Sequence, residues 1–160
     1  ASGQIILLEP YHRNLGKRLV KSPKLYLCDT GLALFLMGFD SWEAAARSPL
    51  AGALWETHVV MQVVKHFTAM GRSALLWFWR TASGAEVDLL IESGGRFKAI
   101  EAKFTERPER SDLKGFEALE DFYGPNSLVK GIIACRTSRA YKMTAGVSAV
   151  PAKKIDQHLE

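Results

Sequence analysis

The chain has 160 residues, of which 48% are hydrophobic and 24% are charged, and its formal net charge is +4 at pH 7. This composition is typical of a globular protein and excludes a disordered chain, and the length suits one domain. The small basic excess permits nucleic-acid binding without requiring it.

Hydropathy and cysteine spacing indicate a cytoplasmic protein with no membrane partner. The most apolar run, residues 32–39, is far shorter than the roughly 18 residues that cross a bilayer. Cys28 and Cys135 share no short spacing with each other or with histidine, which excludes a zinc finger. Two unpaired thiols in apolar runs fit a reducing compartment, and we expect both to be inert.

The amino-terminal part is predicted to contain two strands and a short helix. Residues 5–8 form an apolar strand, and residues 23–29 form a second strand that is broken at Thr30-Gly31. A short apolar helix follows over residues 32–37. The chain does not begin with Met, so we expect it to be a fragment of a longer protein.

A basic segment leads from the first of these strands into the second. Residues 13–24 contain five basic side chains and no acidic one. Such a segment can follow a phosphate backbone or can be a solvated loop, and the sequence leaves both interpretations open. The candidate nucleic-acid-binding residues are Arg13, Lys17, Arg18, Lys21 and, at the end of a later strand, Arg80. Arg80 is equally compatible with a salt bridge.

The middle of the chain predicts a long helix followed by three strands. Apolar residues recur every three or four positions from Leu50 to Phe67, as the buried face of a helix requires. Apolar runs at 74–80, 86–92 and 96–104 are separated by two short turns that contain glycine. Two short turns that join three strands predict an antiparallel meander.

The carboxyl-terminal part completes an α/β fold. Residues 108–121 have the spacing of a surface helix, and residues 129–135 are apolar on both faces, as in an interior strand. Residues 146–150 are expected to add an edge strand. The predicted architecture is a mixed central sheet with an antiparallel meander, flanked by helices.

Three polar residues interrupt the apolar strands of the meander. Glu101 and Lys103 stand two positions apart, so their side chains leave a half-buried strand on the same side. Asp88 interrupts the preceding strand and is expected to face Glu101. Two adjacent buried carboxylates repel each other unless a cation lies between them. Asp88 and Glu101 are therefore candidate ligands for Mg²⁺ or Mn²⁺.

A third acid is predicted to join this pair. Glu56 lies early in the long helix, among apolar residues, where packing against the meander would bring it to Asp88 and Glu101. Glu56 would assist as a metal ligand or through a water molecule. Lys103 would position or deprotonate the attacking water or stabilise charge on a phosphate, so the four residues are the candidate catalytic set. A structural ion pair between Glu101 and Lys103 is the alternative.

These residues carry a resemblance to known families. Glu56, Asp88 and Glu101-x-Lys103 resemble the active-site signature of the PD-(D/E)XK nuclease superfamily, although Val87 stands where proline often precedes the aspartate. Gly52-x-x-x-Glu56 is similar to the corresponding motif of archaeal Holliday-junction resolvases. A closer resemblance, over about residues 10–151, is to domains of unknown function that follow predicted AAA+ ATPases. It rests on Pro23-Lys24-Leu25-Tyr26-x-x-Asp29-Thr30-Gly31-Leu32-Ala33, Gly52-x-x-x-Glu56, Trp79-Arg80-Thr81 with Glu86-Val87-Asp88, and Glu101-x-Lys103.

The resemblance implies a restriction-endonuclease-like core. Residues 1–22 would be the remnant of an upstream winged-helix-like region with its basic loop, and residues 23–152 the nuclease-like domain. Residues 153–160 would be a tail that could be left from cloning. We expect structural roles for Lys24 and Asp29.

The implied function is metal-dependent hydrolysis of DNA phosphodiesters by a domain attached to an upstream AAA+ ATPase module. The alternative is a non-catalytic module that binds DNA or a partner and regulates the ATPase. The chain itself has no Gly-rich phosphate loop of the kind that binds ATP.

Overall fold

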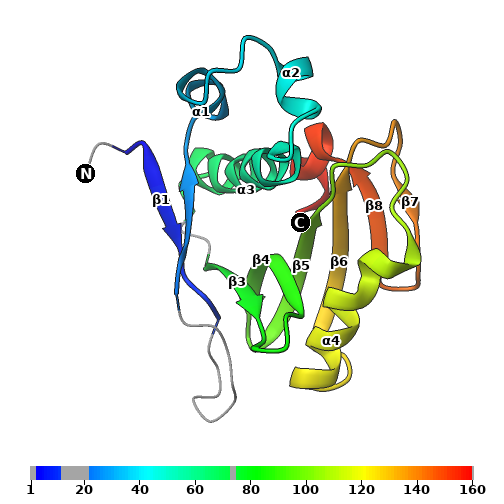
Figure 1. Ribbon diagram of the computed structural model, residues 1–160. Coiled ribbons are helices and arrows are strands. Elements are labelled where there is room, and N and C mark those ends of the chain that lie inside the picture. The colour runs from blue at the N-terminus through cyan, green and yellow to red at the C-terminus, as the bar shows by residue number, and fades with distance from the viewer. Residues whose placement is uncertain (1–2, 12–21, 73–74, 160) are drawn as a thin grey trace.

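The structure, a computed structural model, describes residues 3–11, 22–72 and 75–159. Its centre is a six-stranded mixed sheet in the order β3-β4-β5-β6-β8-β7. A separate two-stranded sheet, β1-β2, stands beside it (Figure 1). The sheet strands are β3 (Leu76–Arg80), β4 (Glu86–Ser93), β5 (Arg96–Ala102), β6 (Leu128–Cys135), β7 (Tyr141–Lys142) and β8 (Val147–Pro151).

The predicted meander is confirmed. β3, β4 and β5 pair antiparallel, and β6 then lies parallel to β5, so the segment between β5 and β6 has to cross over the sheet. The crossover consists of a 3-10 turn, η1 (Arg110–Leu113), that leads directly into α4 (Lys114–Tyr123). The mixed α/β architecture with a flanked central sheet is therefore as expected.

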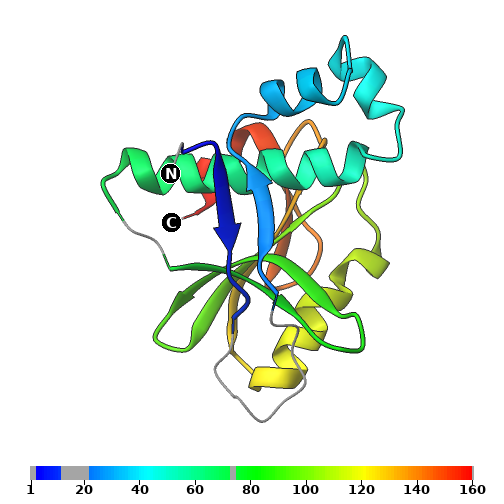
Figure 2. The same cartoon turned by 60° about the vertical axis from the view of Figure 1, so that its left-hand side comes forward.

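Two helices cover opposite faces of the sheet. The long helix α3 (Ala51–Ala69) packs on one face and α4 on the other (Figure 2). Alternate strand residues divide between two buried clusters, as the two-residue repeat of a strand requires. Leu89, Ile100 and Ile132 pack with Val60 under α3. Leu90, Ala99 and Ile133 pack with Phe116 under α4.

A β-bulge in β4 changes the side to which Asp88 points. Trp77 and Trp79 of β3 pair with Leu90 and Val87, so β4 has one extra residue in this interval. Val87 and Leu90 consequently lie in the same cluster, below α4. Asp88 instead points to the α3 side of the sheet, where its Oδ1 lies 3.4 Å from Nζ of Lys24.

The amino-terminal elements surround the start of α3. β1 (Ile5–Leu8) pairs antiparallel with β2 (Lys24–Leu27), and Leu8 is buried in the cluster below α3. α1 (Thr30–Leu36) and α2 (Trp42–Ala46) follow. The second strand ends before Thr30-Gly31, as expected, but the helix begins two residues earlier than predicted. The Asp29 carboxylate accepts a hydrogen bond from the Leu32 N–H at 3.0 Å and caps the helix, which begins at Thr30.

Two features at the carboxyl end differ from expectation. β8 is not an edge strand, because the two-residue strand β7 pairs on its outer side. The closing 3-10 helix, η2 (Ala152–His158), packs against α3, with Ile155 and Leu159 in the core. Residues 152–159 are thus part of the packed domain.

Candidate functional site

Four acidic side chains gather where the start of α3 crosses the meander. Trp55 donates its indole N–H to the carbonyl of Ala134 in β6 at 3.1 Å, which holds this part of α3 against the sheet. The next residue, Glu56, therefore projects toward the residues at the start of β4 and the end of β5. The predicted approach of Glu56 to the meander is confirmed, because Glu56 and Asp88 contact the same ammonium group.

That ammonium group belongs to Lys24. Its Nζ lies 2.7 Å from Oε1 of Glu56 and 3.4 Å from Oδ1 of Asp88, and it also forms an ion pair with Glu86. Lys24 was expected to be structural, and the structure places it at the centre of the acids. Burial acts to lower the pKa of Lys24, but Asp88 and Glu56 outweigh it and raise that pKa above its ordinary range.

Tyr26 is the second contribution of β2. Lys24 and Tyr26 are two residues apart on the strand and reach the same carboxylate, because the Tyr26 hydroxyl donates to Oε1 of Glu56 at 2.6 Å. Burial raises the pKa of Tyr26, and Glu56 raises it further, so this hydroxyl remains a donor. The β1-β2 hairpin is thus tied to α3 through Glu56.

Asp88 and Glu101 form the buried part of the site. Each is only 8% exposed. The β4-β5 pairing ends at Leu89 and Ile100, and Asp88 and Glu101 are the next residues on their strands. Oδ2 of Asp88 accepts a hydrogen bond from the Ala102 N–H at 2.9 Å. The charges of the two acids interact across this end of the β4-β5 pairing, because Asp88 contributes to the raised pKa of Glu101.

The environment disfavours a charge on both acids. Burial raises the pKa of Asp88 to about 6, and Glu56 adds to this shift, while Lys24 opposes it. Burial also raises the pKa of Glu101 to about 8, with Asp88 adding to it and Lys103 opposing it. Oε2 of Glu101 is buried and has no hydrogen-bond partner among the described residues. This is a site where an additional cation would be stabilising.

Lys103 pairs with Glu101. Its Nζ lies 2.9 Å from Oε1 of Glu101, and its side chain is about one-third exposed. Burial acts to lower the pKa of Lys103, but Glu101 outweighs it and the net shift is upward. Lys103 is therefore protonated at neutral pH, so it can stabilise negative charge but is a poor base.

The remaining candidates divide into two groups. Arg80 forms a salt bridge, which was the alternative to its predicted role in nucleic-acid binding. Its Nε lies 3.3 Å from Oε2 of Glu86, and its side chain is 48% exposed. The other four basic candidates, Arg13, Lys17, Arg18 and Lys21, lie outside the described residues. Sequence reasoning missed Tyr26 and Glu86, although each stands two positions from a residue that it singled out, Lys24 and Asp88 respectively.

The acids do not form a ready-made metal cage. Among residues 3–11, 22–72 and 75–159, no three His, Cys, Asp or Glu side chains are arranged to hold a metal ion. Glu56, Glu86 and Asp88 instead share Lys24, and Glu101 pairs with Lys103. Oε2 of Glu101 is the carboxylate oxygen of this site that has no hydrogen-bond partner among the described residues. Of the predicted ligands, Asp88 and Glu101 fit a divalent cation best, and Glu56 would have to exchange Lys24 for it.

Comparison with known protein families shows to which family the chain belongs. Residues 51–155 match the family described as domain of unknown function (DUF4143). The chain is a member of the DUF4143 family. The predicted membership of a family of domains of unknown function is thereby confirmed. Residues 1–43 of this DUF4143 chain match a second family, domain of unknown function (DUF8612).

Two mycobacterial proteins are similar to this DUF4143 chain. They are the uncharacterized protein Mb2031c of Mycobacterium bovis and the uncharacterized protein Rv2008c of Mycobacterium tuberculosis. Each is 36% identical over 148 residues, which cover 92% of the chain. The chain spans about a third (32%) of the length of each relative. In the described part of the chain, no helix combines the length and the apolar character that a membrane span needs.

The raised pKa of Glu101 predicts a pH-dependent stability. The folded state holds the Glu101 proton more tightly than the unfolded state, so this stabilisation is complete below the ordinary pKa of a glutamate and is lost as the pH rises through about 8. The Glu101→Gln variant should therefore lose less stability than wild type between pH 5 and pH 9, by up to about 4 kcal/mol. Urea denaturation at both pH values measures the difference.

The control for this measurement is Glu117→Gln, which removes an exposed carboxylate of α4. It should keep the wild-type dependence on pH. If wild type and Glu101→Gln lose the same amount of stability between pH 5 and pH 9, Glu101 ionises without penalty in the folded protein.

Proposed function

We propose that this domain is a restriction-endonuclease-like hydrolase that cleaves DNA phosphodiester bonds with the help of Mg²⁺ or Mn²⁺. The observation that carries the proposal is a pair of buried acids on neighbouring strands, Asp88 and Glu101, whose charges interact unfavourably, with one Glu101 oxygen that has no partner among the described residues. A divalent cation would satisfy that oxygen and remove the repulsion between the two carboxylates. The element order, a helix, a three-stranded meander, a crossover helix and a parallel strand, is compatible with such a core.

The residues of the site would divide the work as follows. Asp88 and Glu101 would hold the cation, which when bound would lower the pKa of the attacking water and polarise the phosphate. Lys103, protonated and about one-third exposed, would stabilise the charge that develops on the phosphate oxygens. Lys24 and Tyr26 would fix the position of Glu56, which would act through a water molecule.

We also propose that the domain works within a longer protein, attached to an upstream AAA+ ATPase module in the cytoplasm. The support for a longer protein is that the chain spans about a third (32%) of each mycobacterial relative. The ATPase module follows from the resemblance of the sequence motifs. Nucleotide-driven movement of such a module would deliver DNA to the site.

Cleavage tests the proposal directly. Wild type should nick supercoiled plasmid or branched DNA in Mg²⁺ or Mn²⁺ but not in EDTA. Asp88→Asn and Lys103→Met should each reduce the rate about a hundredfold, because each removes a group that acts on the reacting phosphate. Glu92→Gln is the matched control, since Glu92 also lies in β4 but caps the Gly95 N–H at the far turn. Equal residual nicking in all variants would indicate a contaminating nuclease and refute the proposal.

A second candidate function is a non-catalytic module that binds DNA or a protein partner. The observation in its favour is that Lys24 already neutralises Glu56, Glu86 and Asp88, as in a structural ion-pair network. Calorimetric titration with Mn²⁺ separates the two candidates. Binding that is lost in Asp88→Asn supports hydrolysis, and the absence of binding and of cleavage supports the module.

A further inference from the structure

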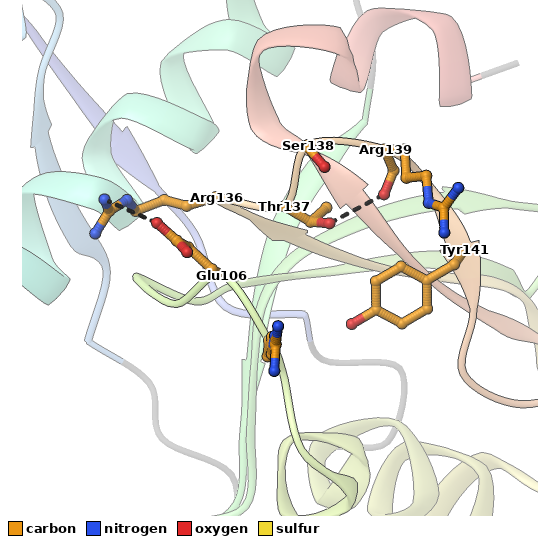
Figure 3. A pocket seen from close by; sticks show the side chains of 7 residues that line it. Glu106, Arg136, Thr137, Ser138, Arg139 and Tyr141 are labelled. Carbon is orange, nitrogen blue, oxygen red and sulfur yellow. Dashed lines mark hydrogen bonds and ion pairs between the residues drawn. The ribbon is translucent and has the colours of Figure 1, made fainter.

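A second polar hollow lies beside the acidic site. It encloses about 650 Å³, which is within the range of ligand-binding pockets. Two segments line it, residues 106–107 after β5 and residues 136–141 after β6 (Figure 3). β5 and β6 are parallel neighbours, and ligands of α/β sheets bind beyond the carboxyl ends of such strands.

The hollow is joined to the acidic site by backbone hydrogen bonds. The Lys103 N–H donates to the carbonyl of Ala134 at 3.0 Å, and the Arg136 N–H donates to the carbonyl of Thr105 at 2.8 Å. These bonds extend the β5-β6 pairing past the ends of both strands. The guanidinium of Arg136 also stacks over the Phe104 ring, 4.6 Å from its centre. Lys103 and the lining residues Glu106 and Arg107 therefore belong to one short segment that follows β5.

The chemistry of the hollow suits phosphate groups. Arg107, Arg136 and Arg139 contribute three positive charges against the single negative charge of Glu106. Arg107 and Arg139 form no ion pair with any residue that the structure describes. Glu106 and Arg136 meet at 3.4 Å, but the Glu106 side chain is 70% exposed, so this is a weak surface pair that an anion can replace.

The other lining groups favour a nucleotide strand over a simple anion. Ser138 supplies a hydroxyl group, the Thr137 hydroxyl donates to the carbonyl of Arg139 at 3.0 Å, and Tyr141, 39% exposed, turns its ring toward the hollow (Figure 3). Phosphates of nucleic acids are bound by arginine and hydroxyl side chains, and exposed aromatic rings stack on bases. The lining has no aliphatic side chain that would suit a lipid.

We infer that this hollow binds the phosphate backbone of a nucleic-acid strand that extends from the acidic site, with Arg107, Arg136 and Arg139 as the phosphate contacts. The inference rests on the proposed action on DNA, but it concerns binding and can be tested without cleavage. It adds contacts after β5 and β6 to the basic candidates predicted from the sequence, Arg13, Lys17, Arg18 and Lys21.

The test is binding of a fluorescein-labelled single-stranded oligonucleotide, followed by anisotropy in EDTA at several salt concentrations. The Arg107→Gln/Arg139→Gln double variant should bind about tenfold or more weakly, and the slope of log affinity against log salt should become shallower by about one to two. Both side chains are exposed, so the thermal midpoint should not change.

The matched control is Arg72→Gln/Arg96→Gln. It removes the same charge from another hollow, which lies at the opposite end of β5. Control and wild type should bind alike. Equal weakening in both double variants would show a general charge effect and overturn the inference, as would wild type that does not bind the oligonucleotide.

Two further outcomes separate this inference from the proposed hydrolysis. If the oligonucleotide binds through the hollow but no metal ion supports cleavage, the hydrolase proposal fails and the binding site stands. If wild type cleaves DNA and the double variant binds normally, the binding site fails alone. ATP and inorganic phosphate serve as competitors: binding of either at the hollow without binding of the oligonucleotide would mean a site for free nucleotides or phosphate and would refute the strand assignment.

Discussion

Replacing Lys24 with methionine should destabilise the protein by about 3–4 kcal/mol at pH 7.5, because it leaves Glu56, Glu86 and Asp88 without their shared cation. The Lys24 side chain is only 20% exposed, so water replaces little of the lost interaction. Methionine preserves most of the apolar stem. Urea denaturation at pH 7.5 measures the effect.

The same variant should recover part of its stability in acid. Without Lys24, the folded state holds protons on the three acids more tightly, so the loss should shrink as the pH falls toward 5. Millimolar Mg²⁺ or Ca²⁺ should raise the thermal midpoint of Lys24→Met more than that of wild type, if the acids can accept a divalent ion in place of the ammonium.

Two comparisons make the result specific to the ion network. Lys65→Met removes an exposed lysine of α3 and should change the stability by less than about 0.5 kcal/mol. Glu86→Gln in the Lys24→Met background should restore part of the loss, since it removes one of the unbalanced charges. A Lys24→Met protein as stable as the Lys65→Met control would show that the acids are neutralised by protonation and not by Lys24.

The site could be predicted where the relevant side chains belong to one local unit. Asp88 lies in β4, and Glu101 and Lys103 lie at and just after the end of β5, so the short turn between these strands was enough to bring the three residues to the same end of the sheet. The side to which Asp88 points depends on the bulge in β4. Glu56 required one further assumption, that the start of the long helix packs on the meander. The Trp55 hydrogen bond to Ala134 shows how that packing is fixed.

The central cation could not be placed in the same way. Lys24 reaches the site from a separate two-stranded sheet, and no short turn links β2 to β4. The spacing of Lys24 and Tyr26 has the same two-residue pattern as Glu101 and Lys103, so it was a usable sign that both side chains point to one partner. The identity of that partner, Glu56, depends on tertiary packing.

Short elements were the other limit of the prediction. The five-residue helix α2 was not predicted, because one turn and a half gives too little periodicity to recognise, although Ser41 caps it through the Ala44 N–H. The two-residue strand β7 likewise left β8 predicted as an edge. The bulge in β4 adds one residue between Val87 and Leu90 and leaves no mark in the hydrophobic pattern.

Gly115 gives the second large predicted effect, because helix α4 packs directly against the backbone of β4 there. A Cβ atom added to Gly115 would overlap the carbonyl oxygen of Glu86 and lie 3.4 Å from Cγ2 of Val87. The obstacle is the backbone of β4 and cannot rotate away. Gly115→Ala should therefore destabilise the protein by about 3 kcal/mol, at the upper end of the cost of overpacking.

Gly115→Ala should lower the stability of the protein, whereas glycine-to-alanine changes in open helix positions usually raise it. Gly52→Ala is the control for this difference. Alanine favours a helix over glycine by about 1 kcal/mol, so Gly52→Ala, where a Cβ meets nothing within 4 Å, should stabilise α3 by about 0.5–1 kcal/mol. Gly115→Ala should also displace Glu86 and so weaken its ion pair with Lys24. Combined with Lys24→Met, Gly115→Ala should thus cost less than it does alone. Stabilisation by both alanines would mean that α4 does not pack against Glu86 as closely as the structure shows.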